Sequence, residues 1–87
     1  MIAIVSKLKE ESWEQFRDRH GDWGRDLALW LGRTHCGLRL RELGELAGGI
    51  DYSTVSIAII RWRERAQAGK NLRRAQERAV QMLNEKM

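Results

Sequence analysis

The sequence predicts an all-α fold of four to five helices in one small domain. The chain has 87 residues, which is enough for a single domain. It contains no proline, the residue that most strongly interrupts a helix. Apolar residues recur at helical spacing in segments that are separated by glycine-containing turns. Together these features favour short helices joined by tight connections around one core.

The N-terminal part of the chain carries the weakest pattern. Residues 1–11 show no clear period, and we interpret them as a flexible or docked lead-in. Ser12 and Gln15 have the spacing of a capping box, which predicts a short helix over about 12–20. Gly21 is expected to end this helix. The helical domain is therefore expected to span residues 12–87.

Four further helices are predicted from apolar stripes and their end signals. Asp22 and Asp51 stand where N-caps are expected, and glycines interrupt the pattern between the stripes. The expected helices cover residues 23–35, 41–47, 52–68 and 72–85. Their apolar faces predict a core that contains Trp23, Leu27, Trp30, Leu31, Leu43, Val55, Ile59 and Trp62.

Cysteine count and hydropathy exclude several classes of protein. Cys36 is the only cysteine, which excludes an internal disulfide and a four-cysteine zinc site, and we expect a buried or half-buried structural thiol. The apolar start, residues 2–5, is far shorter than the apolar stretch of a signal peptide or a membrane helix. We therefore expect a cytoplasmic protein with no membrane partner and no cofactor.

The charge is distributed unevenly along the chain. Residues 1–32 carry 5 basic and 6 acidic groups, a net of −1, whereas residues 33–87 carry 11 and 6, a net of +5. Of the 16 basic residues 12 are arginine, whose forked guanidinium suits phosphate groups and guanine edges. This pattern points to nucleic acid. A solvated helix face would give the same composition.

Residues 38–62 have the layout of a helix-turn-helix. A short helix that contains a small residue, Gly44, is followed by the tight turn Gly48-Gly49 and a longer helix. In a helix-turn-helix, at about residues 40–66 here, the second helix enters the major groove of DNA. Other corners between two helices produce a similar pattern.

The residues of this segment resemble a known family. Leu-Arg-Glu-Leu-Gly at 40–44 and Gly-Gly-Ile-Asp-Tyr-Ser-Thr-Val at 48–55 resemble the signature of the C-terminal DNA-binding domain of the bacterial replication initiator DnaA. Together with Gly-Asp-Trp-Gly-Arg-Asp-Leu at 21–27, the chain looks closest to the DnaA-like domain appended to REP-associated tyrosine transposases. The resemblance covers about residues 12–84 and implies a Trp-repressor-like helical fold. Ile50 and Tyr52 stand where DnaA has arginine and histidine, so the preferred DNA site should differ from a DnaA box.

The chemistry of the transposase nuclease is not expected here. That chemistry needs a histidine–hydrophobic–histidine metal site and a nucleophilic tyrosine. His20 and His35 lie 15 residues apart, and the single tyrosine, Tyr52, lies in the helix-turn-helix. We therefore predict a protein that is not an enzyme, with no catalytic residues and no metal site.

The start of the helix at 52–68 is expected to read base edges. Asp51 is predicted to cap this helix, and the resemblance adds a hydrogen bond from a cytosine amine. Ser53 and Thr54 are expected to contact bases or phosphates, although hydroxyl groups also serve in local capping. Tyr52 either contacts DNA or lies at the edge of the core. Ile57 lies off the buried stripe, where it either packs on the last helix or meets a thymine methyl group.

Five arginines are expected to hold the phosphate backbone. Arg25, Arg33 and Arg61 match positions at which the family carries basic residues, and Arg39 and Arg41 flank the same corner. Taken singly, each of these arginines is a solvated surface charge.

The predicted function is sequence-specific binding of double-stranded DNA by a transposase-derived module. The alternative is a helical protein-interaction or dimerisation domain, in which Ile57, Ile60 and the apolar stripe of the C-terminal helix would form a homodimer or partner interface. Single-stranded nucleic acid is a third option, although the pattern indicates no exposed aromatic side chain for base stacking.

Overall fold

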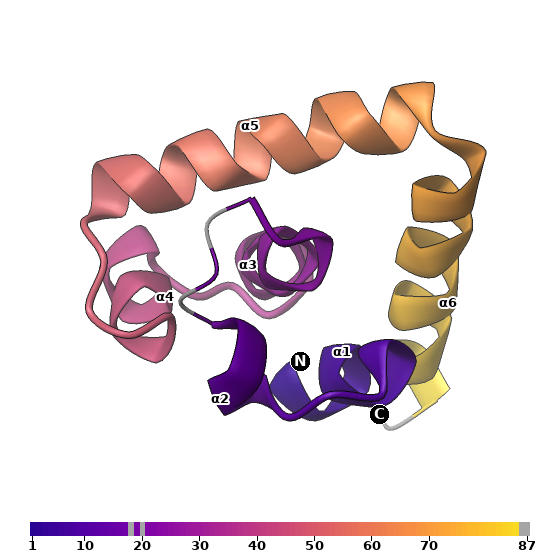
Figure 1. The fold of residues 1–87 in the computed structure, drawn as a ribbon, viewed down its shortest axis with the longest axis horizontal. Coiled ribbons are helices and arrows are strands. Elements are labelled where there is room, and N and C mark those ends of the chain that lie inside the picture. Colours follow the sequence, from indigo (N-terminus) through magenta and orange to yellow (C-terminus); the bar gives the residue numbers. More distant parts are fainter. Residues whose placement is uncertain (18, 20, 86–87) are drawn as a thin grey trace.

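The computed structural model describes residues 1–17, 19 and 21–85, and over these residues it is all-helical, as predicted (Figure 1). Asp18, His20, Lys86 and Met87 lie outside the described residues, and with them the predicted end of the first helix. The helices are α1 (Ile2–Lys9), α2 (Trp13–Phe16), α3 (Trp23–His35), α4 (Leu40–Leu46), α5 (Tyr52–Ala68) and α6 (Lys70–Glu85). The five predicted helices are all present, and α1 is additional.

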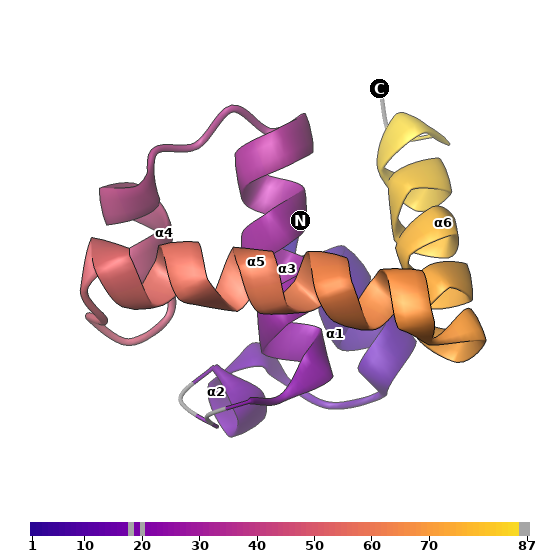
Figure 2. The ribbon, with the colours of Figure 1, turned by 90° about the horizontal axis from the view of Figure 1, so that it is seen from above.

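Helix α3 is the central element of the fold. It contacts α1, α4, α5 and α6, and α5 crosses it (Figures 1 and 2). Helix α4 lies beside the N-terminal end of α5, whereas α6 turns away from the C-terminal end of α5 toward α1 (Figure 1). One long face of α5 therefore looks away from the rest of the molecule.

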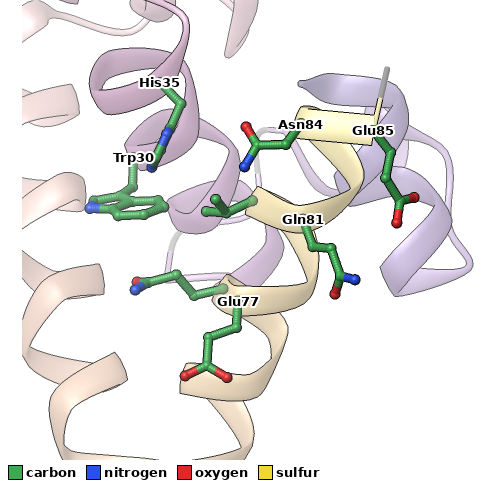
Figure 3. Close-up of a pocket in the computed structure, with 8 residues that line it drawn as sticks. Trp30, His35, Glu77, Gln81, Asn84 and Glu85 are labelled. Atoms are coloured by element: carbon green, nitrogen blue, oxygen red, sulfur yellow. The ribbon is translucent and has the colours of Figure 1, made fainter. Parts of the chain in front are cut away.

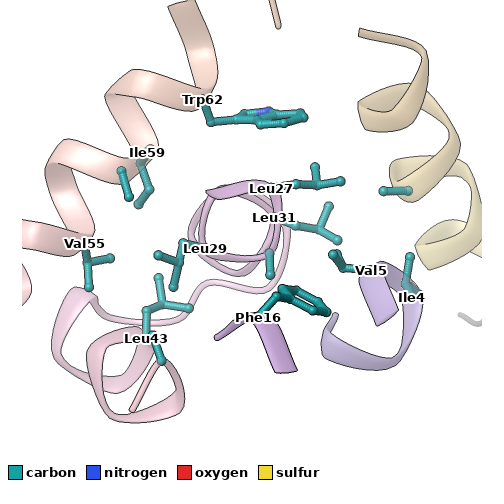
Figure 4. Close-up of a cluster of buried hydrophobic side chains, with 14 of the residues drawn as sticks. Ile4, Val5, Phe16, Leu27, Leu29, Leu31, Leu43, Val55, Ile59 and Trp62 are labelled. Carbon is teal, nitrogen blue, oxygen red and sulfur yellow. The ribbon is translucent and has the colours of Figure 1, made fainter. Parts of the chain in front are cut away.

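The core is built around α3 and closed by aromatic residues (Figure 4). Trp62 on α5 is fully buried, and its indole nitrogen donates to Gln76 Oε1 at 2.7 Å. Trp13 is also buried and donates to the carbonyl of Leu46 at 2.8 Å. Of the predicted core residues, Leu27, Leu31, Leu43, Val55, Ile59 and Trp62 are buried, whereas Trp23 and Trp30 are half-buried at its edge.

Of the two interpretations of residues 1–11, the flexible one is wrong and the docked one is right, because residues 2–9 form a helix that packs on the core. Ile4 and Val5 on α1 are 1% and 0% exposed and belong to the core. At its C-terminal end, Lys9 Nζ lies 2.6 Å from both carboxylate oxygens of Asp22, the N-cap of α3. The stem of Lys9 packs on Gly24, where a Cβ atom would collide with it. Tertiary packing therefore orders a segment whose own sequence has little periodicity.

Three smaller predictions also differ from the structure. Helix α2 ends at Phe16, and α6 begins at Lys70, so that Gly69 alone separates it from α5. Cys36 is exposed rather than buried. Cys36 is the C-cap of α3. The last buried residue of that helix is Gly32, so the end of the helix, with Cys36, lies outside the core.

The Lys9–Asp22 contact gives stability a defined dependence on pH. Burial by itself raises the pKa of Asp22, but hydrogen bonds from Lys9 and from the backbone of Gly24 and Arg25 outweigh it and hold that pKa below the usual 3.8. Because the folded pKa is lowered, the stabilisation is present above pH 3.8 and is lost as the pH falls through the folded value.

Asp22→Asn should therefore lower the free energy of unfolding by about 1–3 kcal/mol at pH 7, the usual worth of a hydrogen bond to a charged group. As the pH falls below 3.8 and through the folded pKa of Asp22, the difference from the parent protein should shrink, because the parent carboxylate then becomes protonated as well. Urea unfolding at pH 7, 4 and 2.5 measures the loss of unfolding free energy and its change with pH. Glu14→Gln, which removes an exposed carboxylate, is the control. A difference that stays constant across this range would contradict the proposed linkage.

Candidate nucleic-acid interface

The corner between α4 and α5 is closed by backbone contacts around Gly44. Its carbonyl oxygen accepts from the N–H groups of Gly49 at 2.9 Å and Ile50 at 3.0 Å. A Cβ atom at Gly44 would collide with the carbonyl oxygen of Ile50. Gly48 and Gly49 adopt φ values of 90° and 86°, which glycine tolerates at no steric cost. The glycines that carried the sequence prediction thus allow the close approach of the two helices.

The outward face of α5 carries large apolar side chains next to hydroxyl groups. On this face Ile57 is 60% exposed and Ile60 50%, and beside it Tyr52 is 61% exposed because it is the first residue of the helix. Ser53 is exposed on the same face, because positions 53, 57 and 60 follow helical spacing opposite the buried side. Figure 2 looks onto this face along its length. The sequence pattern predicts Ile60 only in the alternative interface, although its spacing from Ser53 and Ile57 also indicates this face.

The predicted base-reading residues occupy the start of this face. Asp51 Oδ1 accepts from the N–H of Ser53 at 3.2 Å, which confirms its role as N-cap of α5. The exposure of Tyr52 excludes a position at the edge of the core, and that of Ile57 excludes packing against α6. Thr54 is half-buried and therefore less accessible than its neighbours.

Three of the five predicted phosphate-binding arginines are exposed. Arg33 lies in the last turn of α3 and donates to the carbonyl of Leu38 at 3.2 Å, and Arg39 and Arg41 lie at the start of α4. Three carboxylates of the same stretch of chain, those of Glu42, Glu45 and Asp51, are exposed as well. Within residues 33–51 the three exposed arginines are thus matched by three exposed carboxylates.

The resemblance predicts that Arg61 contacts the phosphate backbone. In the structure, however, its guanidinium is already paired with a carboxylate. Its guanidinium makes a bidentate contact with Asp26, from Nε to Oδ2 at 2.8 Å and from Nη2 to Oδ1 at 3.0 Å. Asp26 on α3 is 0% exposed, and Arg65 lies 3.8 Å from the same carboxylate. The hydrogen bond to Asp26 raises the pKa of Arg61 above its already high ordinary value. Arg61 therefore joins α5 to α3.

The predicted phosphate contact of Arg25 is also inconsistent with the structure. Arg25 is 2% exposed on the first turn of α3, and its Nε and Nη2 atoms have no hydrogen-bond partner within the described part of the chain. A phosphate could reach this guanidinium only after a rearrangement. The sequence could not separate the buried Arg25 and the clamped Arg61 from the exposed arginines, because burial depends on contacts between distant segments.

The described residues contain neither a metal-ligand cluster nor a membrane span. No three of their histidine, cysteine, aspartate and glutamate side chains gather as metal ligands would. Among their helices, none combines the length and the apolar character that a bilayer crossing requires.

Comparison with known proteins gives no relative. No protein-family model matches the chain, no curated protein matches it, and no solved structure matches it. The relationship to the DnaA-like domains stays a prediction that rests on the motif residues.

The Asp26–Arg61 contact can be tested by removing one partner and then both. Arg61→Met should cost about 3–5 kcal/mol of unfolding free energy, because it leaves the buried carboxylate of Asp26 without its bidentate partner. The double variant Asp26→Leu/Arg61→Met should recover most of this loss. Urea unfolding of each variant measures the effect, with Arg63→Met as an exposed arginine control on the same helix. A loss below about 1 kcal/mol for Arg61→Met would show that Arg61 is available for another role.

Proposed function

We propose that this chain binds double-stranded DNA in a sequence-specific manner, with the outward face of α5 in the major groove and α4 beside it. The observation that carries the proposal is the exposed outer side of the first part of α5, whose inner side packs on α4 beside the close contact between Gly44 and Ile50. The major groove is wide enough to admit an α-helix. The motif resemblance to DnaA-like domains supports the same arrangement.

The side chains of this face suit base edges better than phosphates. Tyr52 and Ser53 offer hydroxyl groups, and Ile57 and Ile60 offer apolar surface of the kind that meets thymine methyl groups. Because three carboxylates balance the three exposed arginines, the electrostatic attraction to any duplex should be modest. Specific contacts therefore carry a larger share of the binding in this proposal.

The proposal includes the context that the sequence indicates. It describes a module related to the DNA-recognition domains of transposases, located in the cytoplasm and without catalytic activity of its own. In this proposal Arg33, Arg39 and Arg41 contact phosphates. Arg25 does not, because it is buried, and Arg61 does not, because it is paired with Asp26.

Binding should show a moderate dependence on salt. Three phosphate contacts predict a slope of about −3 for log K against log salt concentration, at about −0.9 for each contact. Arg41→Ala should make this slope shallower by about one unit and weaken binding to all duplexes alike. Fluorescence anisotropy of labelled duplex DNA at several salt concentrations measures both, and Arg78→Ala on α6 serves as the control. A slope near zero would contradict phosphate binding by this surface.

Sequence preference should depend on the first turn of α5. Tyr52→Ala and Ser53→Ala should each cost about 1–3 kcal/mol on a duplex selected from a random pool. Their affinity for random duplex should change little, whereas Arg41→Ala should weaken both kinds of duplex. Equal losses of Tyr52→Ala on both duplexes would show that this turn does not read the bases.

A protein-interaction function is the second candidate, because Ile57 and Ile60 form an exposed apolar pair. A homodimer through the apolar stripe of α6 is disfavoured, since that stripe packs inward. Its apolar members Leu72, Ala75, Ala79, Val80, Met82 and Leu83 all contact or belong to the core. Sedimentation of the parent protein and of Ile57→Ser separates the two functions. A dimer that Ile57→Ser disrupts, without any duplex binding, would favour the interaction domain.

A further inference from the structure

A groove follows the junction of α3, α5 and α6. It consists of two adjoining hollows of about 630 Å³ and 310 Å³. Trp30 and Gln76 line both hollows, so the half-buried indole of Trp30 lies where they meet. In Figure 3, Trp30 and His35 on α3 face Asn84 on α6 across the larger hollow.

The walls of the larger hollow combine aromatic rings with amide groups. The rings of Trp30 and His35 lie 5.3 Å apart between centroids and are tilted by 59°. Gln76 Oε1 accepts from Trp62, which fixes this amide and leaves its nitrogen without an acceptor among the described residues. Asn84, which is exposed on α6, adds a second amide group to the same wall. A planar heterocycle with polar edges matches these groups in shape and in hydrogen-bonding capacity.

Charge divides the groove into two ends. Glu77 and Glu85 line the larger hollow, whereas Arg63 and Arg73 line the smaller one. Arg73 is held in place by hydrogen bonds to the carbonyls at the end of α5, at 3.4 Å and 3.0 Å. Arg63 is exposed and forms no ion pair with the residues that the structure describes. An anion should therefore bind only at the smaller hollow.

We propose that this groove binds a nucleotide, either free or as one unit of single-stranded nucleic acid. The base lies on Trp30 in the larger hollow, and its phosphate lies at Arg63 and Arg73. Base stacking on an aromatic side chain next to arginines is the general basis of single-strand binding. An aromatic residue of a peptide would cover Trp30 but would leave both arginines without an anion. The site does not depend on duplex binding by α5.

The test uses the whole chain and fluorescence anisotropy of a labelled thymidine hexamer. The hexamer should bind, and an abasic hexamer with the same phosphates should bind about tenfold more weakly, because it lacks the stacking base. Competition by thymidine monophosphate assigns the site to free nucleotides, and binding of the hexamer alone assigns it to single strands. Equal binding of the two hexamers, or no binding of either, would overturn the proposal.

Variants of the groove make the test specific. Trp30→Leu and Arg63→Gln should each weaken hexamer binding by about tenfold. Arg78→Gln, which also removes one positive charge but lies on α6 outside the groove, should leave binding unchanged. Thermal unfolding checks that each variant is folded, and Arg63→Gln carries the test if Trp30→Leu does not fold. Unchanged binding by Arg63→Gln would overturn the proposal. Tyr52→Ala should retain hexamer binding, so failure of the duplex proposal is distinguishable from failure of this one.

Discussion

The position of α5 depends on one buried carboxylate. Asp26 is fully enclosed at the start of α3, and such a group is stable as an anion only if cations and hydrogen bonds surround it. Arg61 provides two hydrogen bonds from one turn of α5, and Arg65 adds a second positive charge from the next turn while donating to the carbonyl of Gly21 at 3.0 Å. Since Arg61 and Arg65 are four residues apart, they lie on one side of α5, and together with the buried Val55, Ile59 and Trp62 they fix the rotation of α5 on α3. That rotation decides that Ser53, Ile57 and Ile60 face outward.

A second constraint fixes the opposite end of α5. Gly44 contacts the turn so closely that any side chain there would displace the backbone of Ile50. This contact couples α4 to the start of α5, while the Asp26–Arg61 contact holds its middle. The exposed first turns thus lie between two fixed points, and the side chains on them are presented by rigid backbone. Such rigidity matters for a surface that carries little excess charge, because shape and hydrogen-bond geometry must then supply the selectivity.

The sequence predicts those features that local chemistry determines. Helices α3 and α5 lie where the sequence predicts them, at about 23–35 and 52–68, because Asp22 and Asp51 cap them and Trp62 and its neighbours form clear stripes. The helical form of α1 and its contact with α3 could not be predicted, since Lys9 is 13 residues from Asp22 and a lysine–aspartate pair at that separation leaves no periodic signal. The same limit explains Arg61, whose partner is 35 residues away. In each case the decisive contact joins segments that only the fold brings together.

Arginine has at least three physical roles in this small domain, and composition alone counts them as one. Arg61 neutralises a buried carboxylate, Arg73 satisfies carbonyls at the end of α5, and Arg41 is exposed on the surface of α4. Arg25 differs from all of these, because its guanidinium is buried and two of its nitrogens have no partner among the described residues. Of these four arginines, Arg41 is the one that is exposed and has no hydrogen bond or ion pair with the described residues that a phosphate would have to replace. The excess of basic residues in the second half of the chain therefore overstates the charge available to a nucleic acid, and the proposed surfaces must act mainly through a few placed side chains.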